Sequence, residues 1–221
     1  MTASELSTTQ SFVTQLCELL GVQAPHPTPE QSYMFERPVT FSHGDGSSSA
    51  GRIDCYLRGH FVLEAKKVKA ASHTKGFDDA LLRARAQAES YARALPSDEG
   101  RPPFLLVVDV GNVIELYSEF TRSGATYTPF PDPRSHRIAL GRLVNADVRE
   151  RLKSIWTDPD SLNPSRASAR VTREVAGQLA ELARSLEQSG HRADHVAAFL
   201  TRSLFCMFAE DVELLPKGSF P

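Results

Sequence analysis

Apolar residues recur with a helical period in several stretches of the chain. In residues 7–20 the apolar positions are Phe12, Leu16, Leu19 and Leu20. Because residues three and four apart share one face of a helix, this pattern predicts an amphipathic helix over residues 7–20. The same reasoning predicts further helices over residues 77–95, 145–156, 166–189 and 192–213.

Runs of β-branched, aromatic and aliphatic residues predict the strands. They cover residues 33–41, 53–57, 61–65, 104–109 and 112–120. Pro38 interrupts the first run, which predicts an edge strand or a bulge, because proline cannot donate a backbone hydrogen bond. The order is a helix, three strands, a helix and two strands. It predicts the α/β (α+β) class, with a mixed sheet flanked by helices.

The pattern becomes helical throughout in the last third of the chain. We therefore predict a mixed α/β domain over residues 1–140 and a helical spacer over residues 141–221. The last helix is apolar on several sides, and a helix of that kind needs partners around it. We expect that this segment begins a larger domain of a longer protein, or that it packs against a partner.

Composition and charge limit the classes of protein to which this chain can belong. The 221 residues carry a formal net charge of −2, so any contact with DNA must come from a local basic patch. The three cysteines are widely spaced in apolar surroundings and predict buried thiols in a reducing compartment. The apolar runs are too short to cross a membrane and the N-terminus lacks a secretory pattern, so a cytoplasmic location is the default expectation.

Two carboxylates and a lysine stand out in the strand pair over residues 53–65. Nine residues separate Asp54 from Glu64, and Lys66 follows two positions later. Close carboxylates repel each other and favour a hard cation such as Mg²⁺, which can bridge to a phosphate. A lysine beside them can orient or help to deprotonate the attacking water, or stabilise the developing charge. The pattern indicates phosphodiester hydrolysis, and the alternative is an ion pair on a half-exposed hairpin.

The hairpin register decides whether the two acids converge. A two-residue turn would pair Asp54 with Leu63 and separate the acids onto opposite faces of the sheet. A three-residue loop over residues 58–60 would pair Asp54 with Glu64 on one face. We predict the three-residue loop or a bulge.

Other side chains can complete such a site. Gln87 and Tyr91 lie four apart and share a face of the predicted helix, a pairing seen in RecB-like nucleases. Glu36 on the preceding strand can add a third carboxylate, and Glu18 is a weaker candidate. A basic stretch can follow DNA phosphates, with binding that falls steeply with salt. Its DNA-binding candidates are Lys67, Lys69, Lys75 and Arg83.

Five segments carry a family resemblance. They are FERPV, GRIDCYLRGHFVLEAKK, RPPFLLVVDVGNVIELYSEF, RVTREVAGQLAELARSLEQSGH and VAAFLTRSLFCMFAEDVELLP. Together they resemble the N-terminal part of MmeI-like (type IIL) single-chain restriction–modification enzymes. The resemblance covers nearly the whole chain, and the last two segments look like that family's helical spacer.

The resemblance implies a PD-(D/E)xK nuclease that cuts double-stranded DNA with Mg²⁺, through Asp54, Glu64 and Lys66. Asp54 follows Ile53 rather than the proline of the fold's name. In the parent protein the resemblance also implies an adenine-N6 methyltransferase using S-adenosylmethionine, a target-recognition domain and a role in phage defence. A transient dimer would serve double-strand cutting. The alternatives are a non-cutting scaffold that holds DNA for a methyltransferase and a stand-alone repair nuclease.

Overall fold

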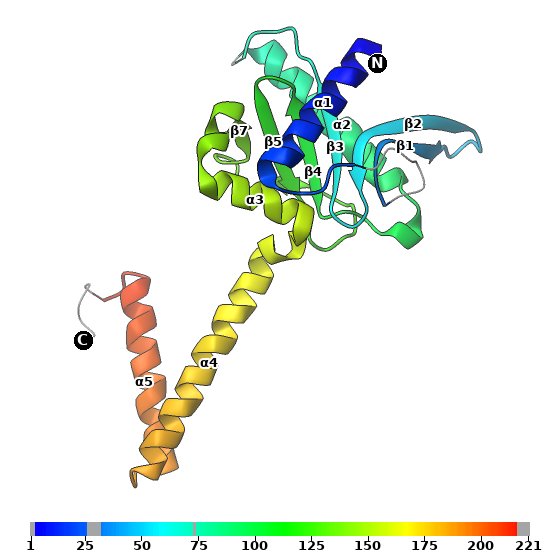
Figure 1. Cartoon of the computed structure of the whole chain (residues 1–221). Helices are drawn as coiled ribbons and strands as arrows, with labels where there is room; N and C mark the ends of the chain where they lie inside the picture. The colour runs from blue at the N-terminus through cyan, green and yellow to red at the C-terminus, as the bar shows by residue number, and fades with distance from the viewer. Residues whose placement is uncertain (1–2, 26–31, 73, 216–221) are drawn as a thin grey trace. The chain divides into compact units, whose positions relative to one another are not determined.

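The chain forms two compact units, Met1–Asn163 and Pro164–Pro221. The computed structural model describes residues 3–25, 32–72 and 74–215. Figure 1 shows a sheet with helices in the first unit and a pair of helices in the second.

The elements of the first unit follow the predicted order along the chain. The strands are β1 (Tyr33–Ser42), β2 (Ser48–Leu57), β3 (Phe61–Lys66), β4 (Phe104–Asp109), β5 (Val113–Ser118), β6 (Thr128–Pro129) and β7 (Arg137–Ala139). The α-helices are α1 (Ala3–Leu20), α2 (Lys75–Ala94) and α3 (Ala146–Thr157). Short 3₁₀ helices are η1 (Ser97–Glu99), η2 (Leu140–Val144) and η3 (Pro159–Leu162).

In the described part of the chain these strands form one seven-stranded sheet. Its order is β1-β2-β3-β4-β5-β6, and β7 also pairs with β5. The pair β3 and β4 is parallel, and the other pairs are antiparallel. A parallel pair needs a crossover connection, and α2 lies in that connection. The predicted α/β class, with a mixed sheet flanked by helices, is confirmed.

Helices cover both faces of the sheet. On one face, Val13 of α1 and Leu152 of α3 belong to the same buried cluster as Leu63 of β3. On the other face, Leu81 of α2 packs in a second cluster with Val62 of β3. Strands β4 and β5 are buried along their whole length, which explains the continuous apolar run Phe104–Val108 in β4.

Helix α3 packs within the first compact unit, which ends at Asn163. Leu152 and Ile155 of α3 are fully buried. The indole Nε1 of Trp156 donates a hydrogen bond to Tyr33 Oη at 2.7 Å. His60 Nδ1 lies 3.1 Å from the carbonyl oxygen of Ile155. Residues 141–163 thus belong with the sheet, because α3 completes the core on one of its faces.

The second unit contains α4 (Pro164–Gln188) and α5 (Ala193–Asp211), which contact each other. Large apolar side chains of α5 are exposed in the structure: Phe199, Leu204, Phe205, Met207 and Phe208. This exposure agrees with the expectation that α5 is apolar on more sides than one partner helix can cover. None of the described helices has the length and apolar character needed to span a membrane.

Candidate functional site

The β2–β3 hairpin has the predicted three-residue loop. Leu57 pairs with Phe61, which leaves residues 58–60 between the strands. Gly59 has a φ of 76°, a left-handed conformation that glycine adopts without steric penalty. The last pair of this register is Cys55 with Leu63, so the next position along both strands places Asp54 opposite Glu64. The two acids therefore share one face of the sheet, as the sequence analysis predicted.

Glu36 extends this row of acids onto β1. The β1–β2 register on either side of Glu36 places it next to Asp54, although the pairing is interrupted there. Glu36 has a φ of 56°, and a left-handed backbone costs about 1–2 kcal/mol for a residue with a Cβ. Its Oε2 lies 3.4 Å from Arg52 Nη1. The role of Glu36 as a third carboxylate stays a prediction.

Asp54 and Glu64 are buried acids with few compensating contacts. Asp54 is 6% exposed and its Oδ2 accepts a hydrogen bond from Ala65 N at 2.7 Å. Burial raises the pKa of Asp54 to about 6. Glu64 is 1% exposed, and burial together with the charge of Asp54 raises its pKa to about 7. The buried Oε2 of Glu64 has no hydrogen-bond partner. Such an orphaned carboxylate oxygen is costly unless a cation or proton satisfies it.

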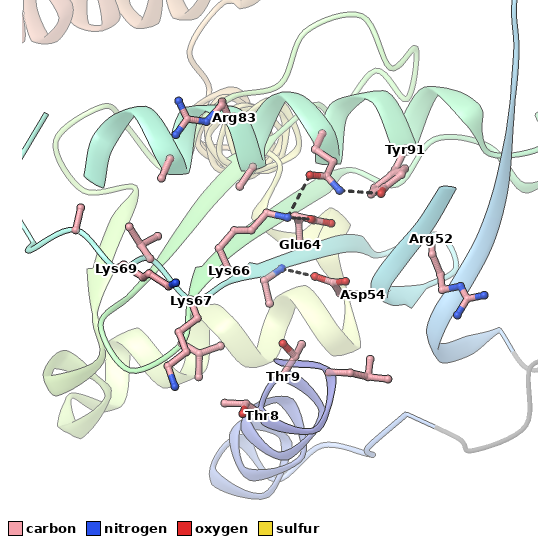
Figure 2. Close-up of a pocket in the computed structure, with 18 of the residues that line it drawn as sticks. Thr8, Thr9, Arg52, Asp54, Glu64, Lys66, Lys67, Lys69, Arg83 and Tyr91 are labelled. Atoms are coloured by element: carbon pink, nitrogen blue, oxygen red, sulfur yellow. Dashed lines mark hydrogen bonds and ion pairs between the residues drawn. The ribbon is translucent and has the colours of Figure 1, made fainter. Parts of the chain in front are cut away.

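Lys66 is held between Glu64 and the helix α2. Its Nζ lies 2.6 Å from Glu64 Oε1 and donates to Gln87 Oε1 at 3.2 Å. The amide Nε2 of Gln87 in turn donates to Tyr91 Oη at 2.8 Å. Figure 2 shows this chain of contacts reaching from β3 to α2. The structure thus brings the predicted Gln87 and Tyr91 next to the predicted lysine.

These residues line one open cleft with a volume of about 1020 Å³. Asp54, Glu64 and Glu36 supply its acidic floor, and four further cations line it besides Lys66: Arg52, Lys67, Lys69 and Arg83. The predicted DNA-binding residues Lys67, Lys69 and Arg83 are exposed at the cleft (Figure 2). The cleft therefore combines a buried acidic floor with basic walls.

Two predicted residues lie elsewhere. Lys75 is exposed at the first position of α2 and does not line the cleft. Glu18 is also exposed and outside the cleft, because it lies near the C-terminal end of α1.

Helix α1 contributes lining residues that sequence reasoning missed. Leu6, Thr8 and Thr9 line the cleft across from the acids, and Thr9 is 3% exposed. Figure 2 shows Thr8 and Thr9 on the helix that faces Asp54. No local motif marks these threonines, since their position depends on how α1 packs against the sheet.

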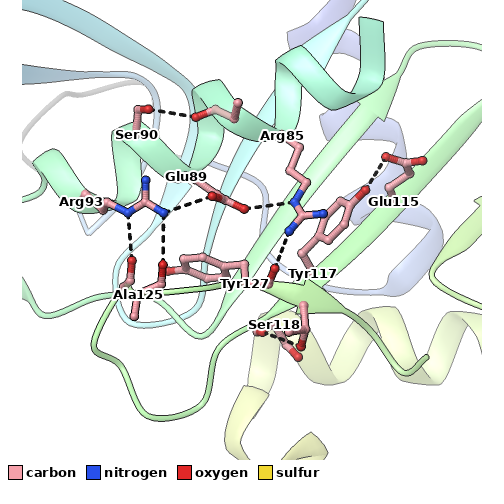
Figure 3. Close-up of polar contacts among 12 residues, drawn as sticks. Arg85, Glu89, Ser90, Arg93, Glu115, Tyr117, Ser118, Ala125 and Tyr127 are labelled. Atoms are coloured by element: carbon pink, nitrogen blue, oxygen red, sulfur yellow. Dashed lines mark hydrogen bonds and ion pairs between the residues drawn. The ribbon is translucent and has the colours of Figure 1, made fainter. Parts of the chain in front are cut away.

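A ladder of charged residues fixes α2 on another side. Glu89 accepts from Arg85 Nε at 3.0 Å and from Arg93 Nη2 at 3.1 Å. Arg85 also donates to the carbonyl oxygen of Tyr127 at 2.6 Å, and Arg93 donates to that of Gly124 at 3.0 Å. Figure 3 shows this ladder between α2 and the segment that carries Tyr127. The helix that presents Gln87 and Tyr91 is thereby anchored to the body of the first unit.

Asp109, at the end of β4, has a structural role. It is fully buried, and its Oδ1 accepts from Val68 N at 2.8 Å while its Oδ2 accepts from Asn112 Nδ2 at 2.6 Å. Both oxygens are satisfied, so Asp109 holds the loop after β3 in place. Among the described residues, no group of three or more His, Cys, Asp or Glu side chains could hold a metal ion. Of the three acids that line the cleft, Asp54 and Glu64 are buried and Glu36 is partly exposed.

A family model described as "MmeI, N-terminal domain" matches residues 2–189. The chain belongs to this family. Membership in the MmeI N-terminal domain family points to a restriction–modification enzyme. Neither the curated proteins nor the solved structures include a match to the chain.

Proposed function

We propose that the first unit is a Mg²⁺-dependent endonuclease module of a restriction–modification enzyme, with a PD-(D/E)xK nuclease fold and double-stranded DNA as substrate. The observation that carries this proposal is the partnerless, buried Oε2 of Glu64, beside Asp54 and Lys66. A structural ion pair would satisfy both carboxylate oxygens, whereas a metal site leaves one directed at the ion.

The donor set suits a hard divalent cation. Mg²⁺ binds through one or two carboxylates and takes its remaining ligands from water and phosphate. Asp54 and Glu64 would hold it, and the open cleft leaves room for a phosphate and for water. When bound, Mg²⁺ supplies Lewis-acid stabilisation of the phosphodiester and of the attacking oxygen.

Lys66 is placed to act on the same phosphate. An ammonium group has three donors, and Glu64 and Gln87 accept two hydrogen bonds from it. The third donor remains for the attacking water or for the charge that builds up on the phosphate. Gln87 fixes the position of the amine, and it takes its own orientation from Tyr91.

The basic walls of the cleft support DNA as the substrate. Lys67, Lys69 and Arg83 are exposed around the acids and can each neutralise a backbone phosphate. Such contacts position a duplex without reading its sequence. The proposed module therefore supplies cutting and a DNA affinity that does not depend on the base sequence.

A cleavage assay with plasmid DNA and Mg²⁺ tests the proposal. The full chain should nick or cut the plasmid, and Lys66→Ala and Asp54→Ala should each slow cleavage at least about 100-fold. Lys75→Ala is the matched control, because this lysine is exposed outside the cleft. Equal cleavage by wild type and Lys66→Ala would reject the assignment. A scaffold that only holds DNA would bind the plasmid in all four proteins and cut it in none.

A further inference from the structure

Gly51 lies where β2 passes beneath two aromatic rings. A Cβ at this position would lie 2.6 Å from Phe41 Cε2 and 2.7 Å from Tyr91 Cε1. Carbon atoms in favourable contact are about 3.5–4.0 Å apart, so each ring would have to retreat by about 1 Å. The rings of Phe41 and Tyr91 are stacked, with centroids 5.8 Å apart. Because Gly51 has no side chain, the two stacked rings can pack directly against the backbone of β2.

The packing of Tyr91 over Gly51 affects the proposed site through one hydrogen bond. Tyr91 is 8% exposed, and its Oη accepts the hydrogen bond that orients the amide of Gln87. That orientation presents Gln87 Oε1, rather than Nε2, to Lys66 Nζ. A shift of about 1 Å in the Tyr91 ring would carry the 2.8 Å hydrogen bond beyond the usual limit of about 3.2 Å. The position of the lysine amine thus depends on the space above Gly51.

We propose that Gly51 is a positioning residue: by leaving room for the Tyr91–Phe41 stack, it sets the Gln87 amide that holds the Lys66 amine. This inference rests on the proposed nuclease function. It adds the β1–β2 hairpin to the parts of the fold that determine the rate of cutting, because Gly51 and Phe41 both lie on that hairpin. Misplacing a reacting group by about 1 Å can lower a rate about 100-fold.

The test compares Gly51→Ala with Gly44→Ala in the full chain. Gly44 lies in the same hairpin, and a Cβ there meets no atom within 4 Å. Gly51→Ala should slow single-turnover DNA cleavage about 10- to 100-fold and leave Mn²⁺ affinity, measured by calorimetry, within about twofold. It should also move the side-chain amide NMR resonance of Gln87. Gly44→Ala should match the wild type in all three measurements.

A double variant separates positioning from general damage. Tyr91→Ala should slow cleavage by a similar factor, and adding Gly51→Ala should lower the rate by no more than about twofold further, because the vacated space lets Phe41 retreat. Effects that multiply would overturn the inference. Wild-type cleavage by Gly51→Ala would overturn it as well.

Two safeguards keep the test decisive. Should Gly51→Ala fail to fold, Tyr91→Phe keeps the ring but removes the acceptor; a rate and a Gln87 resonance like those of the wild type would then refute the inference. Should the wild type cut no DNA, the proposed function fails by itself. The Gln87 resonance then decides the positioning role, which is refuted if Gly51→Ala leaves that resonance in place.

Discussion

Glu64→Gln should make the metal-free protein more stable at pH 8. The buried Glu64 carboxyl has a pKa of about 7, against an ordinary value of 4.5, so its charged form is disfavoured in the folded state. The unfolded chain loses this proton near pH 4.5, whereas the folded chain keeps it until about pH 7. The free energy of unfolding therefore falls as the pH rises through this window, and the full penalty is present above pH 7.

The size of the effect follows from the same pKa values. A tenfold change in acidity corresponds to about 1.4 kcal/mol, so the difference between 7 and 4.5 corresponds to about 3 kcal/mol. The pKa of about 7 already includes the attraction of Lys66, so the ion pair needs no separate deduction, but burying the amide that replaces the carboxylate offsets part of this gain. A net gain of about 1–3 kcal/mol at pH 8 remains. For a chain of this size it raises the melting temperature by roughly 2–10 °C.

Thermal unfolding in EDTA at pH 5 and pH 8 measures this gain. The two proteins should differ little at pH 5 and most at pH 8. Added Mg²⁺ should raise the melting temperature of the wild type, because a ligand that binds the folded state stabilises it, and should do so less in Glu64→Gln. The gain in stability without metal and the loss of the metal response together mark a binding site rather than a structural contact.

Glu115→Gln is the matched control for this prediction. Glu115 is also 1% exposed, but it accepts hydrogen bonds from Arg137 Nε at 2.7 Å and from Tyr117 Oη at 2.9 Å. Its replacement should lower the stability by about 1–3 kcal/mol, because Arg137 loses the buried one of its two charged partners and keeps only Asp78. If Glu64→Gln destabilised the metal-free protein at pH 8 in the same way, Glu64 would be a structural residue and the metal-site reasoning would be refuted.

Three further predictions follow from the same contacts. Mn²⁺ affinity should weaken as the pH falls from 8 to 5.5, because the pKa values of Asp54 (about 6) and Glu64 (about 7) are raised and protons then compete with the metal. Calorimetry in two buffers of different ionisation enthalpy should also detect proton release on binding. Equal affinities at both pH values would contradict this prediction. Lys67→Ala should reduce the salt slope of DNA binding by about one, measured by fluorescence anisotropy, whereas Lys75→Ala should leave the slope unchanged. Tyr33→Phe should lower the stability by about 1–3 kcal/mol in urea titrations without changing Mn²⁺ affinity, because it removes the acceptor of a buried indole N–H; unchanged stability would show that this bond contributes nothing.

The parts of the site that the sequence predicted are those fixed by local rules. Loop length and strand alternation determine that Asp54 and Glu64 share a face, and helical spacing does the same for Gln87 and Tyr91. Strands β2 and β3 and helix α2 are consecutive in the chain, so the connections between them keep these two pairs of residues close together. The side-chain contacts among Glu64, Lys66 and Gln87 agree with this local prediction.

The parts that the sequence did not predict depend on distant packing. Thr8 and Thr9 reach the cleft only because α1 lies across one face of the sheet. The left-handed backbone of Glu36 has no sequence signal, since the residue is neither glycine nor asparagine. Helix α3 joins the first unit through tertiary contacts such as that between Trp156 and Tyr33, which are far apart in the sequence.

The two sides of α2 show why the unsatisfied acids are informative. On the ladder side, the partly buried Arg85 and Glu89 and the exposed Arg93 bond to one another and to nearby carbonyl groups (Figure 3). On the cleft side, the same helix faces a carboxylate oxygen with no partner and acids whose pKa values burial has raised. Under the proposed function a cation would complete this second network, and the rigid support on the first side would fix the geometry of the acids that hold it.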